Sequence, residues 1–217
     1  MNNRFLSIVI LCCVMFTLQG CETAYYGALE KVGIHKRDIM SDRIVDARDA
    51  QEEAKQEFRS ALERFSTELG FSGGDLEEKY NTLSDAFTSS EEKAEAVSAR
   101  IEALESVSEA LFDEWNDELS QYKNERLRRD SESQLKQTER HYKRMLASMH
   151  RAEKRMAPVL DTFRDQVLYL KHNLNARAIA SLKSEFGSLE KDIGRLIKEM
   201  ELSIAQADQF IETLGKQ

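Results

Sequence analysis

The sequence predicts an all-α protein, built as an elongated antiparallel helical bundle or coiled coil of long helices. The 217 residues include a single proline, and 32% of them are charged. No stretch alternates between apolar and polar side chains with the two-residue period of a half-buried strand. Apolar residues instead recur every three or four positions, which places them on one face of a helix. Sixty helical residues reach about 90 Å, so an elongated bundle fits better than a compact globule.

The first predicted helix spans about residues 22–69. The segment Gly70–Gly74 follows it, and glycines can adopt the left-handed backbone conformation that ends a helix. Asp75 can then cap the next helix, so a turn is predicted at residues 70–75. The apolar stripe of this first helix is interrupted by Gln51 and consists of Ile44, Ala47, Ala54, Phe58, Ala61, Phe65 and Leu69.

A short helix is predicted over residues 75–87, followed by a long helix over residues 91–156. Ser89 and Glu92 have the Ser-x-x-Glu spacing of a capping box, which predicts the start of the long helix. Its apolar stripe crosses a polar interval at residues 123–133, which is either a bend or a solvated turn. The stripe consists of Val97, Ile101, Leu104, Leu111, Trp115, Leu119, Tyr122, Leu135, Tyr142, Met145, Met149, Ala152 and Met156. Its three methionines are interpreted as core residues, because flexible thioethers fill irregular gaps between helices.

Pro158 separates the long helix from a last predicted helix over residues 158–214. Proline lacks an amide donor and disfavours helical geometry at the preceding residue, so a kink or a turn is expected here. The apolar stripe crosses Pro158 without losing phase, which favours a kink. Beyond it the stripe is close to a heptad pattern and consists of Val167, Leu170, Leu174, Leu182, Phe186, Leu189, Ile193, Leu196, Met200, Ile204, Ala207, Ile211 and Leu214.

Residues 1–20 have the layout of an export signal that is removed from the mature protein. Arg4 precedes an apolar stretch from Phe5 to Phe16, and small or polar residues follow it. That stretch is too short for a transmembrane helix, which needs about 20 apolar residues. Leu18–Cys21 resembles a bacterial lipobox, which implies a diacylglycerol on Cys21, cleavage before Cys21 and acylation of the new amine. The alternative is an ordinary secretory signal that happens to end near a cysteine.

Lipidation of Cys21 would anchor the mature chain, residues 21–217, firmly to a membrane, because one residue would carry several acyl chains. The other two cysteines, Cys12 and Cys13, lie in the signal, which excludes disulfides, zinc–thiolate sites and a catalytic cysteine. The residue directly after the cysteine is Glu22 and not an aspartate. By resemblance to the sorting of Gram-negative lipoproteins, this favours the outer membrane over the inner one. The expected location is the cell envelope, with the protein facing the periplasm.

Charge is distributed unevenly along the mature chain. Residues 75–118 contain 3 basic and 14 acidic residues, whereas residues 123–155 contain 11 basic and 5 acidic residues. One interpretation is that the two arms lie antiparallel in one bundle and neutralise each other. The other is that the basic arm binds an anionic lipid or an envelope polymer. Candidate interaction residues on this arm are Arg140, Lys143, Arg144 and Arg151.

Motifs for catalysis, cofactors and metals are missing or out of context. Gly70, Ser72 and Gly74 match Gly-x-Ser-x-Gly, but that motif acts on a strand-to-helix turn of an α/β sheet, and helices flank it here. The chain has no P-loop motif and no His-Glu-x-x-His pair among its four histidines. The expectation is a protein that is not an enzyme, with no cofactor and no metal.

Several segments together resemble a family of bacterial lipoproteins of unknown function, DUF2959. They are Tyr25–Tyr26, Glu30–Ile39, Asp46–Ala54, Leu127–Ser131 and Arg164–Arg177. The resemblance covers nearly the whole mature chain and implies a helical envelope lipoprotein with nothing catalytic. The last segment contains His172, Asn173 and Asn175, although asparagine is a poor residue inside a helix. This run is a candidate interaction patch, and a helix break or a buried polar residue that sets the register explains it equally well.

Two functions follow as expectations. In the first, a non-catalytic structural or adaptor lipoprotein is fixed at one end by Cys21 and reaches toward an envelope protein or peptidoglycan. Its apolar stripe packs either within one chain or between two copies of the chain, and in the second case the protein is a homo-oligomer. In the second, the protein is a binding module that binds anionic lipid or an envelope polymer through residues 123–155. Nucleic acid is not an expected partner outside the cytoplasm.

Overall fold

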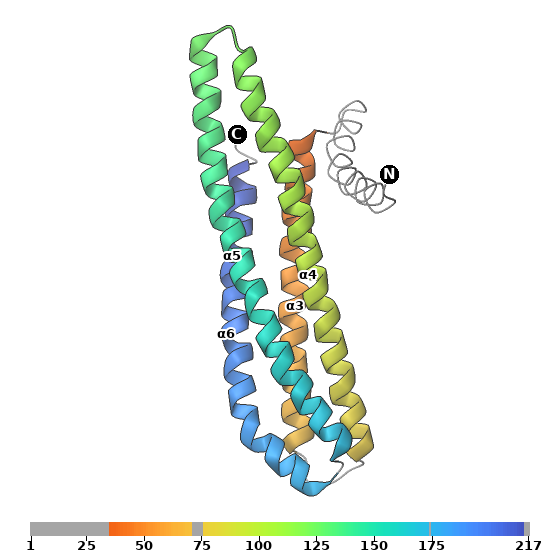
Figure 1. Ribbon diagram of the computed structural model, residues 1–217. Coiled ribbons are helices and arrows are strands. Elements are labelled where there is room, and N and C mark those ends of the chain that lie inside the picture. Colours follow the sequence, from red (N-terminus) through yellow and green to blue (C-terminus); the bar gives the residue numbers. More distant parts are fainter. Residues whose placement is uncertain (1–34, 71–75, 174, 215–217) are drawn as a thin grey trace, which may run out of the picture.

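The computed structural model describes residues 35–70, 76–173 and 175–214. Four long helices lie side by side in alternating directions: α3 (Lys36–Gly70), α4 (Leu76–Glu118), α5 (Glu125–His172) and α6 (Ala176–Leu214). A short 3-10 helix, η1 (Leu119–Gln121), lies between α4 and α5. Figure 1 shows the resulting elongated bundle. The predicted all-α fold and its antiparallel bundle architecture are confirmed.

Each helix packs against two neighbours in a closed ring: α3 and α5 both contact α4 and α6. At about 1.5 Å per residue, the 48 residues of α5 extend over about 72 Å. The hairpin between α4 and α5 extends beyond the start of α3 and the end of α6 (Figure 1). The turn between α5 and α6 lies at the opposite end (Figure 1). The bundle therefore has two different ends, one with the N-terminus of α3 and one with the α5–α6 turn.

The core follows from heptad spacing, which α3 shows most clearly. Its buried positions alternate in steps of four and three residues, so one narrow stripe faces the other helices. The apolar members of the predicted stripe are all buried, with Leu69 at 3% the most exposed. Gln51 lies in this stripe, fully buried, with neither side-chain polar atom hydrogen-bonded within the described chain. The prediction that this face of α3 forms the core is confirmed.

A cluster of four phenylalanines joins all four helices near the α5–α6 end. Phe163 of α5 contacts Phe65 of α3 edge-on with ring centroids 5.5 Å apart, and Phe87 of α4 at 5.7 Å. Phe186 of α6 stacks on Phe65 at 5.9 Å. Edge-on and offset aromatic pairs add stabilisation beyond the area they bury. Phe163 is 1% exposed and lies at the centre of this cluster.

The predicted break near Ser89 is wrong, because α4 is continuous from Leu76 to Glu118. Ser90 is fully buried in the bundle, and its hydroxyl donates to the carbonyl oxygen of Ala86 at 2.8 Å. A serine bonded to the preceding turn is compatible with a helix interior. The Ser-x-x-Glu spacing therefore does not start a helix here, because packing of the stripe on both sides keeps the helix intact.

The predicted continuous helix over residues 91–156 is also wrong, because the chain reverses at residues 119–124. Asn124 begins α5, since its side-chain oxygen accepts hydrogen bonds from the amides of Arg126 and Leu127 at 3.0 and 3.2 Å. Trp115 donates from Nε1 to the Ser131 hydroxyl at 2.8 Å and so ties α4 to α5 below the turn. The polar interval is therefore a turn followed by the first turns of α5.

The predicted helix boundary at residues 156–158 is wrong, and so is the alternative of a turn at Pro158. Helix α5 continues through Pro158 to His172, and the last helix begins only at Ala176. Pro158 is on the exposed side of α5, so its ring faces away from the core. The missing amide costs one backbone hydrogen bond, and the buried stripe on the other side holds the helix together.

Some predicted features lie outside the described residues. These are the signal over residues 1–20, Cys21, the part of the first helix before residue 35, and residues 71–75 with Ser72 and Asp75. Among the helices that the structure describes, none has the length and apolarity required to cross a bilayer.

Candidate interaction surfaces

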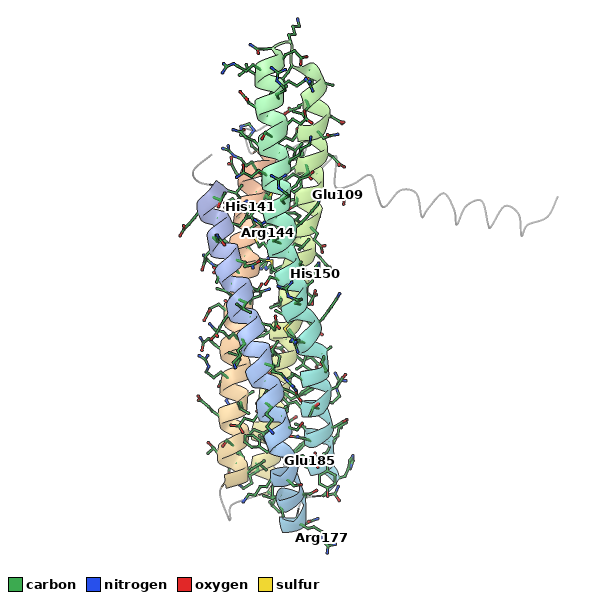
Figure 2. The ribbon with its side chains drawn as sticks, turned by 90° about the vertical axis from the view of Figure 1, so that its left-hand side faces the viewer. Glu109, His141, Arg144, His150, Arg177 and Glu185 are labelled. Carbon is green, nitrogen blue, oxygen red and sulfur yellow. The ribbon has the colours of Figure 1, made fainter. Side chains whose placement is uncertain are left out.

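The predicted basic residues of α5 form a strip on its outer face. Arg140, Lys143, Arg144 and Arg151 are all exposed. Spacings of three, four and seven residues return to the same side of a helix, which is why these four side chains lie together. Figure 2 shows Arg144 in the half of the bundle nearer the α4–α5 hairpin. We call these four residues the basic strip.

The basic strip is only partly neutralised. Lys143 pairs with Glu139 of its own helix at 3.3 Å, and Arg151 approaches Glu199 of α6 at 3.9 Å. Within the described chain, Arg140 and Arg144 have no carboxylate partner. The acidic α4 and the basic α5 do lie antiparallel and adjacent, as expected. Of the basic strip, Arg140 and Arg144 nevertheless remain available to other molecules.

His150 makes one of the ionic contacts between α4 and α5. Its Nε2 lies 3.1 Å from Glu105 of α4, and its Nδ1 lies 2.8 Å from Glu153 of α5. Partial burial lowers the pKa of His150, but hydrogen bonds to Glu153 and Glu105 outweigh it, so the pKa is raised above 6.5. The protonated imidazole therefore links the two helices in neutral to mildly acidic solution.

We expect replacement of His150 by glutamine to remove a pH-dependent part of the stability. Because the folded-state pKa is raised, the histidine contributes its full stabilisation below pH 6.5 and loses it as pH rises through the folded-state pKa. The difference between wild type and H150Q should stay below about 1 kcal/mol, because both pairs are partly exposed. Urea unfolding between about pH 5.5 and 8.5 measures it. A difference that does not fall with increasing pH would contradict the assignment.

His172 is the last residue of α5, and Asn173 and Asn175 lie between α5 and α6, so the helix-break interpretation is correct. Asn173 donates from Nδ2 to the Tyr169 carbonyl oxygen at 2.9 Å, which ends α5. Asn175 accepts from the Ala178 amide at 3.0 Å, which starts α6. His172 and Asn175 are exposed. The turn lies about 30 Å along α5 from Arg151, so the structure does not join this run to the basic strip.

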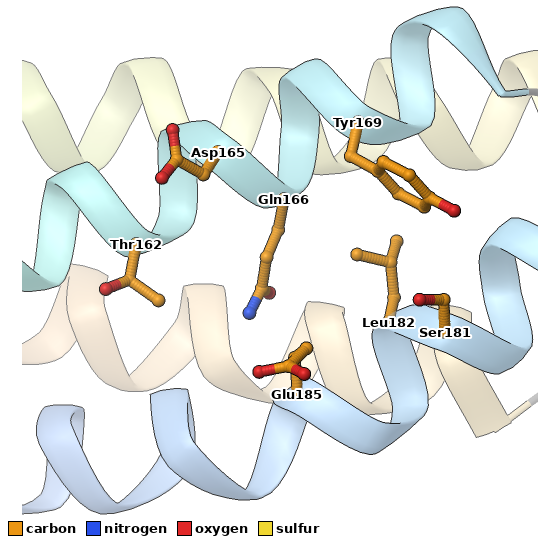
Figure 3. A pocket seen from close by; sticks show the side chains of 7 residues that line it. All are labelled: Thr162, Asp165, Gln166, Tyr169, Ser181, Leu182 and Glu185. Atoms are coloured by element: carbon orange, nitrogen blue, oxygen red, sulfur yellow. The ribbon is translucent and has the colours of Figure 1, made fainter.

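A hollow beside this turn was not predicted from the sequence. It lies between α5 and α6, with a volume of about 310 Å³, and is lined by Thr162, Asp165, Gln166, Tyr169, Ser181, Leu182 and Glu185 (Figure 3). Gln166 is 6% exposed and its Oε1 has no hydrogen-bond partner among the described residues. The sequence feature that indicates this hollow is Gln166, a polar residue next to Val167 within an otherwise apolar stripe.

The α4–α5 hairpin presents a second uncovered surface. Tyr122 and Leu127 are 40% and 46% exposed there, because α3 and α6 do not reach this far (Figure 1). Trp115, a member of the predicted apolar stripe, is half-buried, and its indole N–H is bonded to Ser131. This residue therefore holds the hairpin together.

The histidines do not form a metal site in the part of the chain that the structure describes. No group of three or more His, Cys, Asp or Glu side chains is arranged there to hold a metal ion. Met145, Met149 and Met156 are at most 2% exposed and pack in the core, as predicted. The candidate binding features of the described surface are the basic strip, the hollow and the hairpin.

Comparison with known proteins gives one family. A family model described as "Protein of unknown function (DUF2959)" matches residues 25–214. No curated protein and no solved structure matches this chain. The match covers all four helices of the bundle.

Proposed function

We propose that this chain, which belongs to the DUF2959 family of proteins of unknown function, is a non-catalytic adaptor lipoprotein of the bacterial envelope. Cys21 carries the lipid, and the bundle spans from the membrane toward an envelope protein or peptidoglycan. The periplasmic face of the outer membrane is the proposed location, on the basis of Glu22. Firm anchoring requires more than one acyl chain, and a lipidated cysteine supplies them.

The observation that carries this proposal is the separation of the two ends of the bundle. Helix α3 begins at Lys36, 15 residues after Cys21. From there its 35 residues extend about 52 Å toward the end with the α5–α6 turn. Lys36 is held in place by Glu114 of α4 at 3.1 Å. A lipid at the N-terminal side therefore leaves the α5–α6 turn as the end farthest from the anchor.

Replacement of Cys21 by serine is expected to abolish lipid attachment completely, since serine has no thiol to receive the diacylglycerol. Incorporation of an alkyne-labelled palmitate and the mass of the purified protein measure this. The wild-type protein should lack residues 1–20 and carry acyl chains, and C21S should carry none. Cys13→Ser is the matched control, because this cysteine lies in the signal and its loss should change neither result. An unmodified wild-type N-terminus would contradict the proposal.

The adaptor role is tested by photo-crosslinking in living cells. A photoreactive amino acid is placed at exposed positions near the α5–α6 turn, such as Leu168, and in the middle of the bundle, such as Leu202. The proposal expects a discrete envelope partner, or a second copy of the chain, from the positions near the turn. A protein that remains monomeric and gives no cross-linked partner from any position would contradict it.

A second candidate function is binding of anionic lipid or an envelope polymer through the basic strip. The exposed Arg140 and Arg144, which lack carboxylate partners in the described chain, favour it. Clustered basic residues at a membrane surface each contribute about 1 kcal/mol of attraction to anionic lipid. This attraction weakens as salt increases.

Charge reversal of the basic strip to glutamate should lower binding to vesicles of anionic lipid at least about tenfold. Sedimentation with vesicles at low and high salt measures the binding. Reversal of four exposed cations of α6, Lys183, Lys191, Arg195 and Lys198, is the control with the same change in net charge. Equal loss in both variants, or no loss in either, would exclude the basic strip as the binding surface.

A further inference from the structure

The α4–α5 hairpin protrudes from the bundle at the end where α3 begins (Figure 1). Lys36, the first residue of α3, contacts Glu114 of α4 at 3.1 Å, and Tyr122 follows Glu114 by eight residues. At about 1.5 Å per residue, the hairpin therefore extends about 12 Å beyond the start of α3. We call residues 122–129 the hairpin tip.

The hairpin tip exposes two large apolar side chains. Tyr122 is 40% exposed and Leu127 is 46% exposed. The Tyr122 hydroxyl lies 3.5 Å from the Ser131 hydroxyl oxygen, which leaves part of the ring uncovered. Tyrosine is enriched where a membrane meets water, because its ring is apolar and its hydroxyl is polar. The hairpin tip therefore has the side chains of a surface that contacts lipid headgroups.

The charge of the hairpin tip is positive and mostly unpaired. Four basic residues and one acidic residue give it a net charge of +3. The acidic residue, Glu125, pairs with Arg128 at 3.1 Å. Lys123, Arg126 and Arg129 are exposed, and none of them has a carboxylate partner among the described residues. The other carboxylates of this end lie outside the hairpin tip and are those of Asp117, Glu118 and Asp130. Three free cations beside apolar side chains match an anionic lipid surface.

The length of chain before α3 brings the lipid anchor within reach of the hairpin tip. Cys21 precedes Lys36 by 15 residues. Even at the 1.5 Å per residue of a helix, 15 residues span about 22 Å, which is more than the 12 Å by which the hairpin protrudes. A lipid on Cys21 can therefore lie in a membrane whose surface is level with the hairpin tip.

We propose that the hairpin tip rests on the membrane that holds the lipid of Cys21. Lys123, Arg126 and Arg129 bind the phosphates of anionic phospholipid, and Tyr122 and Leu127 lie at the level of the headgroups. This inference rests on the proposed lipid anchor and adds a second attachment point, which holds the bundle upright with the α5–α6 turn away from the membrane. The basic strip begins 11 residues beyond Arg129, about 16 Å further along α5, so it is a separate surface.

The test measures the depth of a fluorophore in vesicles. The mature chain contains no cysteine besides Cys21, so a cysteine introduced at residue 127 takes the label alone when Cys21 is lipidated. A label at residue 202, where Leu202 is 58% exposed in the middle of the bundle, is the control. The purified, lipidated full mature chain is inserted into vesicles of phosphatidylcholine with or without phosphatidylglycerol. A nitroxide on the lipid headgroups quenches a fluorophore that lies near them.

The proposal expects strong quenching of the label at residue 127 in vesicles with phosphatidylglycerol. Quenching should weaken without phosphatidylglycerol or at high salt, because the attraction is electrostatic. The label at residue 202 should stay unquenched. Equal quenching at both positions, or none at residue 127, would overturn the proposal. A label at residue 127 that is shielded from water but not quenched would assign the hairpin tip to residues 22–34 or to a second copy of the chain, and would also overturn it.

Variants make the assignment specific. Reversal of Lys123, Arg126 and Arg129 to glutamate should abolish quenching at residue 127. Reversal of three exposed, unpaired cations of α6, Lys183, Lys191 and Lys198, causes the same change in net charge and should leave quenching unchanged. Arg126→Gln alone should lower the ratio of membrane-bound to free hairpin tips about fivefold, as expected for one cation at an anionic surface. Equal effects of the two triple reversals would overturn the proposal.

Failure of this inference can be told apart from failure of the anchor proposal. Lipid attachment is read from the mass of the N-terminus, and contact of the hairpin tip is read from quenching. A lipidated protein whose label at residue 127 is not quenched would overturn the hairpin contact alone. An unlipidated protein that shows the quenching at residue 127 when mixed with the same vesicles would overturn the anchor alone.

Discussion

Replacement of Phe163 by alanine is expected to lower the free energy of unfolding by about 3–5 kcal/mol. The ring is 1% exposed and contacts Phe65 and Phe87, which lie on two other helices. Its loss removes apolar surface from the core and leaves a cavity that the surrounding helices close only in part. Equilibrium unfolding in urea, followed by circular dichroism, measures the change.

Leu168→Ala is the matched control for this prediction. Leu168 lies on the same helix five residues away, but it is 47% exposed. Surface substitutions usually change stability by less than about 0.5 kcal/mol. A loss below about 1 kcal/mol for F163A would contradict the central role of the phenylalanine cluster.

Replacement of Pro158 by alanine is expected to raise the free energy of unfolding by about 2 kcal/mol. Proline inside a helix costs about 3 kcal/mol relative to alanine, because it lacks the amide donor and crowds the preceding turn. Part of this is offset, because proline also restricts the unfolded chain. Helix α5 contains Pro158 in its interior and on its exposed side, so alanine should fit without repacking the core. Urea unfolding measures the gain.

The reverse substitution serves as the control. Ala147 is also exposed on α5, three turns before Pro158, and A147P should lower the free energy of unfolding by about 3 kcal/mol. If P158A lowers stability, the proline shapes α5 in a way that the core requires. That outcome would contradict the interpretation that the helix tolerates Pro158 at a cost.

The helical faces could be predicted from the sequence because burial follows spacing alone. The stripe on α3 and the methionines of α5 are core residues for this reason. Helix ends were harder to predict. The reversal at residues 119–124 contains neither glycine nor proline, and Leu119 and Tyr122 continue the apolar spacing through it. The turn depends on the Asn124 cap and on the bond between Trp115 and Ser131, which exists only after the two helices have packed.

The candidate surfaces also differ in whether the sequence alone predicts them. The basic strip could be predicted, because its residues share one face of a single helix. The hollow could not, because Gln166 and Glu185 lie on two helices whose pairing the local pattern leaves open. The capping-box spacing at Ser89 shows the opposite case, since the continuous buried stripe of α4 determines the helix there and the local pattern does not.

The order of the helices around the ring also has a consequence for the speed of folding. Three of the four interfaces join helices that are consecutive in the chain, so most contacts form between nearby segments. Proteins dominated by such contacts fold within microseconds to milliseconds. The remaining interface joins the first described helix to the last, where Arg48 bonds Asp208 at 3.0 Å. Folding is thus completed only after α6 has been synthesised. A truncated chain that lacks α6 would expose to solvent the side of α3 that α6 covers.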